Sequence, residues 1–352
     1  MFLKNCWYVA AWDHEISDGL ISRTILDHPV VLFRGPDSLP HALEDRCCHR
    51  GLPLSLGNVR ESTVQCGYHG LEFNFDGVCV NIPGQSTIPP EARVRSYPVV
   101  EKWRWVWIWM GQADAADDAR IPDFHELDDP GWRARGSRIP MRCDYRLAVD
   151  NLLDLSHLTF VHQTTLGNAA VVDAADVKTE RYNAGVRVTR WMIDVPAPPM
   201  YCKLMDFNTN IDRWQIIDFD PPCFVKLDLG GAPTGTGAVQ GDRSKGFERR
   251  SLNAITPETE TSVHYFWADA HNFNLDQPAV TDLLYEQVLE AFIEDRAVME
   301  AQQASLDRAP GRAFGCRSRH HRHLRDQPSL LDRGHQRYDH LAVDGCGQPS
   351  LG

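Results

Sequence analysis

Long apolar runs and clustered positive charge are both missing from the sequence. No stretch of its 352 residues approaches the roughly 18 uninterrupted apolar residues of a membrane span, and Asp13, His14 and Glu15 interrupt the N-terminal segment before a signal region could form. Lys and Arg total 36 against 48 Asp and Glu, giving a net charge of −12, and no basic block precedes the C-terminal tail. Nucleic-acid binding needs clustered Lys and Arg. We therefore expect a cytoplasmic protein with no membrane span and no nucleic-acid partner.

The composition is that of an ordinary globular protein, with 43% apolar and 24% charged residues. The length allows one large domain or two ordinary ones. Ten cysteines without a secretion signal indicate metal ligands or buried thiols before a disulfide scaffold. Five of them are expected to be small buried side chains, namely Cys6, Cys79, Cys143, Cys202 and Cys223.

Short apolar or alternating runs fill the first hundred residues. They lie at 7–12, 28–34, 62–66, 71–75 and 95–100 and are separated by turn residues, which predicts a small antiparallel β domain. Residues 102–109 place four tryptophans at a spacing of two, so we expect one strand face of packed indoles. The Ala-, Asp-, Gly- and Pro-rich stretch at about 110–140 is typical of a connection between domains.

The remaining chain alternates between helical and strand-like stretches. Helices are expected at about 145–162 and 276–305, and strands at about 187–195, 213–230 and 248–268. This order predicts an α+β domain whose helices cover one face of an antiparallel sheet. The predicted domains are 1–110, 111–315 and a His- and Arg-rich tail at 316–352, whose histidines are expected to be incidental and not a metal site.

Two short motifs pair cysteine with histidine: Cys47-x-His49 and Cys66-x-x-His69, with sixteen residues between them. Two thiolates and two imidazoles can hold a tetrahedral zinc ion or a two-iron, two-sulfur cluster. Zinc fingers usually place Cys with Cys and His with His, whereas each motif here supplies one of each. That arrangement favours a cluster held between two loops.

A second group of polar residues interrupts an apolar stretch: Asp150, Asn151, Asp154, His157 and His162. Burying such groups is costly unless they are paired or bind a metal. The two histidines are five residues apart, about 140° around an ideal helix, so the helix must distort or end near His162 for both to face one ion. A carboxylate from elsewhere would complete a two-histidine, one-carboxylate Fe(II) site with positions open for O₂.

Both patterns resemble those of the Rieske non-haem iron aromatic-ring oxygenases. The first matches the Rieske signature, including Arg50-Gly51 and Gly70 next to the histidines, and the second matches the pattern D-x-x-H-x-x-x-x-H. Cys48 stands where that family usually has proline, and we expect it to be an inert loop residue. The resemblance implies an all-β Rieske domain followed by a helix-grip-like α+β catalytic domain.

The resemblance also implies roles for individual residues. A Rieske [2Fe-2S] cluster would be bound by Cys47, His49, Cys66 and His69, and a mononuclear Fe(II) by His157, His162 and Asp295. Glu294 competes with Asp295 for the third position. In this family the residue matching Asp154 bridges to a Rieske histidine, here His69, of the adjacent subunit in a homotrimer. Asn151 matches a residue close to the iron in some relatives.

Further segments resemble the vanillate O-demethylase group of oxygenase components over about residues 1–308. They include KNCWYVA at 4–10, CDYRLAVDNLLDLSH at 143–157, DRWQI at 212–216 and ITPETETSVHYFW at 255–267. The resemblance implies O-demethylation of a methoxylated aromatic acid, vanillate to protocatechuate and formaldehyde, with O₂ and with electrons from NAD(P)H through a flavin/iron–sulfur reductase.

Other functions stay open at this point. One is hydroxylation or demethylation of another aromatic acid, such as a syringate- or dicamba-like compound. Another is a non-catalytic Rieske electron carrier, although a carrier has no reason to keep Asp154, His157, His162 and Asp295.

Three residues are candidates for contact with the substrate. Arg213 would pair with a carboxylate, against the simpler interpretation of a strand-surface arginine. Asn253 and His264 lie in strands that line the pocket in relatives, against ordinary cross-strand roles. Beyond about residue 308 the resemblance stops, and the tail has the composition expected from a reading-frame change in a high-GC gene.

Overall fold

The computed structural model describes residues 2–17, 19–163, 166–167, 175–182, 185–205 and 207–309, so the tail predicted at 316–352 lies outside the described residues. The chain divides into two compact units. Among the described residues, the first comprises those within 1–128, 138–145 and 254–266, and the second comprises those within 129–137, 146–253 and 267–309. No helix in the described part of the chain is long and apolar enough to cross a membrane.

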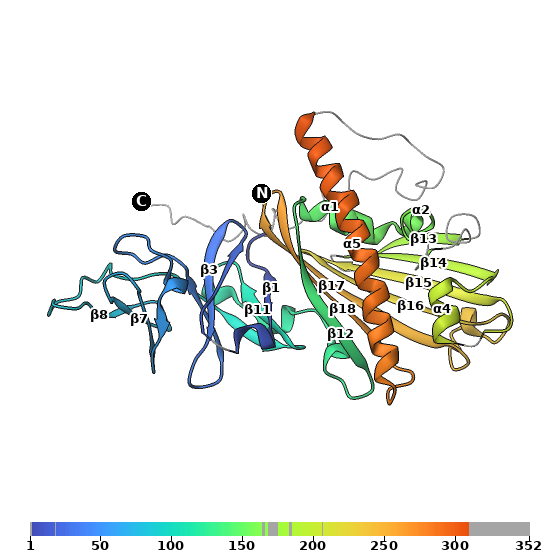
Figure 1. The fold of residues 1–352 in the computed structure, drawn as a ribbon, viewed down its shortest axis with the longest axis horizontal. Helices are drawn as coiled ribbons and strands as arrows, with labels where there is room; N and C mark the ends of the chain where they lie inside the picture. Colours follow the sequence, from blue (N-terminus) through green and yellow to red (C-terminus); the bar gives the residue numbers. More distant parts are fainter. Residues whose placement is uncertain are drawn as a thin grey trace, which may run out of the picture. The chain divides into compact units, whose positions relative to one another are not determined.

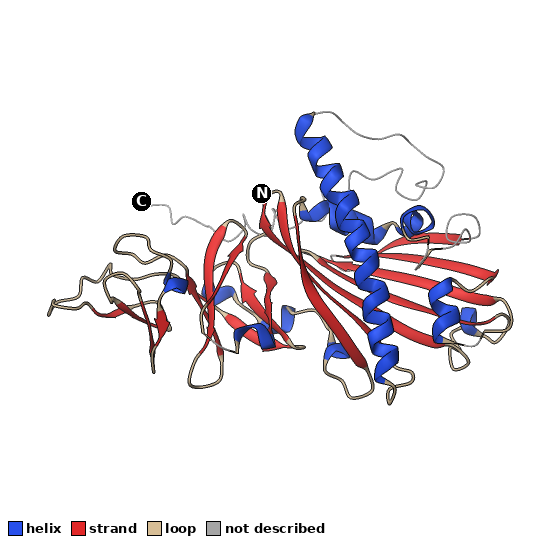
Figure 2. Cartoon of the chain, in the orientation of Figure 1, coloured by secondary structure: helices blue, strands red, loops and turns tan. Residues whose placement is uncertain are grey.

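The first unit consists mainly of short strands and loops (Figure 2). The described strands within residues 1–128 form three sheets, in the orders β1-β11-β10, β2-β3-β4-β9 and β5-β6-β7-β8. The strands are β1 (Trp7–Trp12), β2 (Ile21–Ile25), β3 (His28–Arg34), β4 (Pro40–Glu44), β5 (Asn58–Val59), β6 (Thr63–Gln65), β7 (Glu72–Asn74), β8 (Cys79–Asn81), β9 (Ser96–Tyr97), β10 (Val99–Lys102) and β11 (Trp105–Trp109). The predicted antiparallel β domain is confirmed.

Strand β11 carries three of the four tryptophans, and Trp105, Trp107 and Trp109 are completely buried. The prediction that Trp103 shares their strand face is wrong. Trp103 and Arg104 both have φ of 56° and form the turn between β10 and β11. A two-residue hairpin turn of this kind needs positive φ at both central positions, which removes Trp103 from the strand.

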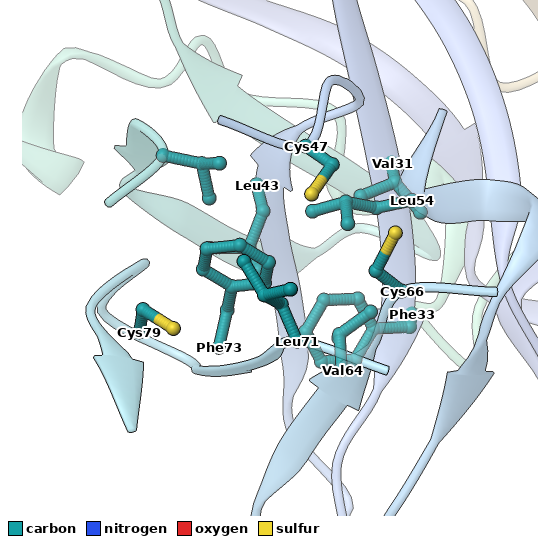
Figure 3. Packing of buried hydrophobic residues seen from close by; sticks show 11 residues of the cluster. Val31, Phe33, Leu43, Cys47, Leu54, Val64, Cys66, Leu71, Phe73 and Cys79 are labelled. Carbon is teal, nitrogen blue, oxygen red and sulfur yellow. The ribbon is translucent and has the colours of Figure 1, made fainter. Parts of the chain in front are cut away.

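A compact apolar core supports the two Cys/His motifs. Side chains of Val31, Leu43, Leu54, Val64 and Phe73 pack together there with the thiols of both motifs (Figure 3). All five are completely buried. This closely packed core therefore holds the two loops that carry the motifs in place.

The other described strands belong to a seven-stranded sheet with the order β12-β18-β17-β16-β15-β14-β13, most of whose residues fall in the second unit. The strands are β12 (Arg133–Met141), β13 (Ala175–Tyr182), β14 (Gly185–Val195), β15 (Ile211–Asp220), β16 (Phe224–Pro233), β17 (Phe247–Thr259) and β18 (Ser262–His271). The pairs from β13 to β16 are antiparallel. Each of the long strand-like stretches predicted at 213–230 and 248–268 is a hairpin of two strands.

Strand β12 corrects the prediction that residues 110–140 only connect domains. Three 3₁₀ turns occupy Ala113–Ala115, Asp118–Arg120 and His125–Leu127, and β12 then forms an edge of the sheet. Gly136 allows the close approach of β12 to β18, because a Cβ atom at this position would lie 2.0 Å from the Trp267 carbonyl oxygen. Sheet pairing thus overrides a local composition that favours a loop.

Helix α5 (Pro278–Arg308) runs across one face of this sheet (Figure 1). Trp267 of β18 stacks on Tyr285 and meets Phe292 edge to face, with ring centroids 5.3 and 5.1 Å apart. The other helices are α1 (Tyr145–Leu153), α2 (Leu158–Val161) and α4 (Pro199–Leu204), with a 3₁₀ turn, η6 (Leu155–His157), between α1 and α2. The predicted α+β architecture, with helix over an antiparallel sheet, is confirmed.

Four of the five cysteines predicted to be buried are buried, but Cys202 is exposed. It lies in α4, and its thiol donates to the Ala197 carbonyl oxygen at 3.6 Å. Composition alone carries no information about which face of so short a helix meets the core.

Candidate functional site

The two Cys/His motifs lie on loops with the same backbone pattern. In each loop the cysteine N–H donates to the carbonyl five residues later, and the cysteine carbonyl accepts from the N–H four residues later. The bonds are Cys47 N to Leu52 O (2.8 Å), Gly51 N to Cys47 O (2.9 Å), Cys66 N to Leu71 O (2.8 Å) and Gly70 N to Cys66 O (3.1 Å). Gly51 and Gly70 both have φ of 73°, a left-handed conformation that favours glycine.

The four side chains sort into a buried pair and an exposed pair. Cys47 and Cys66 are 3% exposed, and their thiols point toward each other (Figure 3). His49 and His69 are exposed, with ring centroids 4.6 Å apart. Burial raises the pKa of the Cys47 thiol to about 11. Two facing thiols beside two neighbouring imidazoles fit the donor set of a [2Fe-2S] cluster with a Cys pair and a His pair.

Cys48 is exposed, unlike its neighbour Cys47. Its side chain lines a surface hollow of about 290 Å³ together with His49 and Leu71. The thiol therefore does not share the buried position of Cys47 and Cys66, in keeping with its expected place as a loop residue.

A second group forms in the other unit, where His157, His162 and Asp295 meet. Their ligand atoms all lie within 4.8 Å of one another. Asp295 Oδ1 is 3.1 Å from His162 Nε2 and 3.5 Å from His157 Nε2. Two ligands at right angles, each about 2.1 Å from a metal ion, are about 3.0 Å apart, so the three side chains fit one ion.

Both histidines lie at the ends of short helical segments. Asp154 caps η6, its Oδ1 accepting from the Ser156 N–H at 3.0 Å, and His157 ends that turn. Helix α2 stops at His162, whose φ of −110° and ψ of 43° are not helical. The predicted single helix over 145–162 is thus broken, and the expectation that the helix distorts or ends near His162 is confirmed.

The outer nitrogen of each ring is fixed by a separate partner. His157 Nδ1 donates to the Asp154 carbonyl oxygen at 2.7 Å, and His162 Nδ1 lies 2.7 Å from Glu294 Oε2. Both Nε2 atoms are thereby turned toward Asp295. Of the two adjacent acids in α5, Asp295 belongs to the three-residue group, whereas Glu294 contacts the opposite side of the His162 ring. A carboxylate in the position of Glu294 typically orients a metal-binding histidine.

The pKa values of the two imidazoles shift in opposite directions. Burial lowers the pKa of His157. Burial acts in the same direction on His162, but hydrogen bonds and charge from Asp295 and Glu294 outweigh it and raise the pKa of His162. A divalent cation bound among these atoms would compete with protons for the ring nitrogens.

Asn151 and Asp154 flank this group. Asn151 Nδ2 donates to Asp295 Oδ1 at 3.2 Å. Asp154 Oδ1 lies 3.6 Å from Nη2 of Arg190, a buried arginine of β14 that sequence reasoning missed. Burial lowers the pKa of Arg190 although Asp154 acts to raise it. The sequence pattern could have indicated that Arg190 is buried, because Arg190 occupies an inward position in the alternating run of β14.

A pocket opens beside His157, His162 and Asp295, between the sheet and helices α2 and α5. It contains about 520 Å³ of space outside atoms, including the part open to solvent, of which the centres of water molecules can occupy about 50 Å³. An aromatic ring therefore enters only when side chains move apart. Apolar side chains that line it include Leu152, Leu155, Leu158, Leu227, Leu229 and Phe292.

Of the three predicted substrate contacts, only Arg213 lines this pocket. Asn253 is completely buried, and its Nδ2 donates to the Val225 carbonyl and Ser251 Oγ. His264 belongs to the first unit, where its Nε2 lies 3.0 Å from the Thr24 carbonyl oxygen. Neither Asn253 nor His264 lines this pocket, and internal hydrogen bonds hold both side chains.

Polar residues of the pocket that the sequence did not reveal are Gln215, Arg249 and Ser251. Gln215 lies two residues after Arg213 in β15, and Arg249 and Ser251 are likewise two residues apart in β17. Strand periodicity puts each pair on one face of the sheet. Only the strand order brings the two pairs to the same pocket.

Two family models match the chain. The Rieske [2Fe-2S] domain matches residues 6–98, and the vanillate O-demethylase oxygenase C-terminal domain matches residues 141–326. The second match continues past residue 308, where the sequence reasoning expected the resemblance to stop.

Characterised relatives align over most of the chain. The iron–sulfur subunit TsaM1 of the toluene-4-sulfonate monooxygenase system of Comamonas testosteroni is 45% identical, covering 89% of this chain and 91% of the relative. A vanillate O-demethylase oxygenase subunit from Pseudomonas sp. (strain HR199 / DSM 7063) is 38% identical, covering 89% of both chains.

A solved structure shares the fold over nearly the whole length. The crystal structure of dicamba monooxygenase bound to dicamba has a TM-score of 0.86 and 32% identity, covering 97% of this chain and 99% of that one. Such oxygenase components work in multicomponent systems, which implies a reductase partner. Domain models, relatives and fold agree, and the chain belongs to the Rieske non-haem iron oxygenases, in the group with a vanillate O-demethylase-type catalytic domain.

Proposed function

We propose that this chain is the oxygenase component of a monooxygenase that oxidises a methyl carbon carried by an aromatic acid. The first candidate reaction is the O-demethylation of vanillate to protocatechuate and formaldehyde. The observation that carries the proposal is the pocket itself, in which apolar walls lead from an arginine, Arg213, to His157, His162 and Asp295. Such a lining suits a flat apolar ring with one charged end, which enters when the side chains move apart.

In this proposal, Cys47, His49, Cys66 and His69 hold the Rieske cluster in residues 1–110, and His157, His162 and Asp295 hold Fe(II) in residues 111–315. When bound, the cluster supplies electrons and the iron supplies O₂ activation. The protein's part is to orient the ring, exclude water and fix the two histidines through the Asp154 carbonyl and Glu294.

Electrons come from NAD(P)H through a flavin/iron–sulfur reductase, and the oxygenase works as a homotrimer. The family resemblance supports both statements. In the trimer, Asp154 would hydrogen-bond His69 of an adjacent subunit and link it to His157, which would give electrons a short route between the two metal centres. Asn151 keeps Asp295 oriented through its 3.2 Å hydrogen bond.

A second candidate is hydroxylation of the methyl group of toluene-4-sulfonate. Two relatives favour it, at 45% and 43% identity, because both are named as iron–sulfur subunits of toluene-4-sulfonate monooxygenase systems. The two candidates share one reaction: substrate, O₂, NADH and a proton give an oxidised methyl carbon, water and NAD⁺. With a methoxy group, the hemiacetal formed releases formaldehyde and leaves a phenol.

Product analysis tests the proposal and separates the candidates. The iron-loaded protein, NADH and a flavin/iron–sulfur reductase are incubated with vanillate or with toluene-4-sulfonate. Formaldehyde with protocatechuate supports the first candidate, and 4-(hydroxymethyl)benzenesulfonate supports the second. If a protein with both metal centres loaded oxidises neither compound, the proposed function is wrong.

A further inference from the structure

Two neighbouring polar side chains of β15 face the pocket with unused hydrogen-bonding capacity. Arg213 is 3% exposed and Gln215 is 1% exposed. We propose that Arg213 and Gln215 form the subsite that binds the anionic group of the substrate, a carboxylate or a sulfonate on an aromatic ring. This inference rests on the proposed function, because it assigns the charged end of the same pocket.

The Arg213 guanidinium has no acidic partner in the described part of the chain. Its Nη2 donates to the Leu166 carbonyl oxygen at 3.3 Å, and its guanidinium carbon lies 5.0 Å from the centre of the Tyr201 ring. Nε and Nη1 are buried without a hydrogen-bond partner among the described residues. A buried cation in this condition is costly to maintain, and the oxygen atoms of an anion would supply acceptors that its free N–H groups lack.

Arg249, the other arginine that lines the pocket, is already neutralised. Its Nε and Nη2 donate to Asp269 Oδ2 at 3.1 and 2.5 Å, and its Nη1 donates to the Met200 sulfur at 3.3 Å. Both members of this ion pair are almost completely buried. An incoming anion at Arg249 would have to displace Asp269, whereas at Arg213 it displaces no carboxylate.

Gln215 adds hydrogen bonding without adding charge. Its Oε1 is buried with no hydrogen-bond partner among the described residues, and because an amide oxygen only accepts hydrogen bonds, the group that can contact an anion is the Nε2 amide. Strand geometry puts Gln215 and Arg213 on the same face, and Gln215 pairs across the sheet with Leu229 of β16. A glutamate here would neutralise Arg213, whereas an amide leaves the arginine charged and can donate to a second oxygen of the anion.

The rest of the pocket fits the body of such a molecule. Leu227 and Leu229 extend the wall along β16, and Val288 and Phe292 face them from α5. With the anion at Arg213, the far end of the ring is the part free to approach His157, His162 and Asp295. The substrate class is therefore an aromatic monoanion with an oxidisable carbon away from the charge.

Calorimetric titration of the full chain with toluene-4-sulfonate and with vanillate tests the subsite without turnover. Vanillyl alcohol serves as the neutral analogue of vanillate. We expect the wild type to bind at least one anion about tenfold or more tightly than the alcohol. Arg213→Met should weaken anion binding by about 10- to 100-fold and change binding of the alcohol by less than about threefold. Whichever anion binds more tightly identifies the charged group.

Three further variants complete the test. Arg213→Lys should recover part of the anion affinity, and Gln215→Glu should abolish it, since the new carboxylate would pair with Arg213. Arg187→Met is the matched control, because Arg187 of β14 is exposed and pairs with Asp218. An intact Rieske absorption spectrum and circular dichroism spectrum show that each variant is folded. If Arg213→Met does not fold, the anion affinity of Arg213→Lys is compared with that of the wild type instead.

The inference is overturned if the wild type binds no anion better than the alcohol, or if the Arg213 variants bind anions as the wild type does. Equal loss of anion and alcohol binding also overturns it, because that outcome indicates a disturbed pocket and not a lost charge. Anion binding that depends on Arg213, together with no oxidised product in the presence of a reductase, would leave the subsite standing and reject the proposed function.

Discussion

The Nδ1 atom of His162 lies 2.7 Å from Oε2 of Glu294, on the side of the ring opposite to Asp295. This contact fixes which nitrogen of His162 faces the proposed iron. Carboxylates placed behind metal-binding histidines typically change metal affinity by about 10- to 100-fold.

Glu294→Ala should therefore weaken Fe(II) binding at the mononuclear site by about 10- to 100-fold, while the Rieske absorption stays unchanged. The Fe(II) affinity of Glu294→Gln should lie between those of the wild type and Glu294→Ala, because an amide oxygen still accepts a hydrogen bond from Nδ1 of His162. The measurement is Fe(II) titration of protein freed of mononuclear iron. Glu290→Gln, an exposed acid on the same helix, serves as control. Unchanged affinity in Glu294→Ala would show that the contact does not orient the ring.

Cys48 of the first loop and Cys66 of the second loop should respond in opposite ways to substitution by serine. Cys48 is exposed, whereas Cys47 and Cys66 are buried and face each other. Cys66→Ser should lose the visible absorption of the cluster, and Cys48→Ser should keep it. Absorption and electron paramagnetic resonance spectra of the reduced proteins provide the measurement. A spectrum that survives Cys66→Ser, or is lost in Cys48→Ser, would contradict the ligand assignment.

The local motifs could be predicted from the sequence because their chemistry depends on short spacings. Cys47 and His49 lie in one loop, and the break in the helix before His162 follows from the five-residue spacing of the histidines. The place of Asp295 came from family resemblance, and the structure puts it, and not Glu294, beside both Nε2 atoms.

Long-range pairing was not predictable in the same way. The neutral pair Arg249 and Asp269 joins β17 to β18, and the pocket position of Gln215 depends on strand order. No short spacing in the sequence indicates that Arg249 pairs with Asp269 or that Gln215 reaches the pocket. The prediction of Asn253 and His264 as substrate contacts came from family resemblance, and the structure adds that hydrogen bonds within the protein hold both side chains.

The buried pair of Arg249 and Asp269 predicts a dependence of stability on pH. Burial raises the pKa of Asp269 to about 6, although Arg249 acts to lower it. The folded state then binds a proton that the unfolded state releases near pH 4, so this group's contribution to stability is largest below about pH 4 and falls until about pH 6. The whole change is on the order of 3 kcal/mol.

Asp269→Asn removes this titration. The free energy of unfolding of the wild type minus that of Asp269→Asn should therefore decrease between pH 4 and pH 6 and stay level above. Urea unfolding of both proteins across this range checks it. A difference that grows with pH would mean that Arg249 lowers the pKa of Asp269 below that of an exposed aspartate.

Gly136 should not tolerate a side chain. A Cβ atom there would lie 2.0 Å from the Trp267 carbonyl oxygen and 2.6 Å from the Ala268 Cα, so β12 must shift away from β18. We expect Gly136→Ala to cost about 1–3 kcal/mol or more of unfolding free energy. Gly131→Ala, which meets only the Asp129 side chain at 3.0 Å, should cost less. Equal stability of the two variants in urea unfolding would rule out the close approach.

The central claim is that His157, His162 and Asp295 hold a catalytic iron separate from the cluster. Its most direct test is the iron content of Asp295→Ala beside the wild type, with substrate oxidation measured on the same samples. The account predicts about three irons per chain in the wild type and about two in the variant, with an unchanged Rieske spectrum and no oxidised product. A variant that keeps all of its iron and still oxidises the substrate would contradict it.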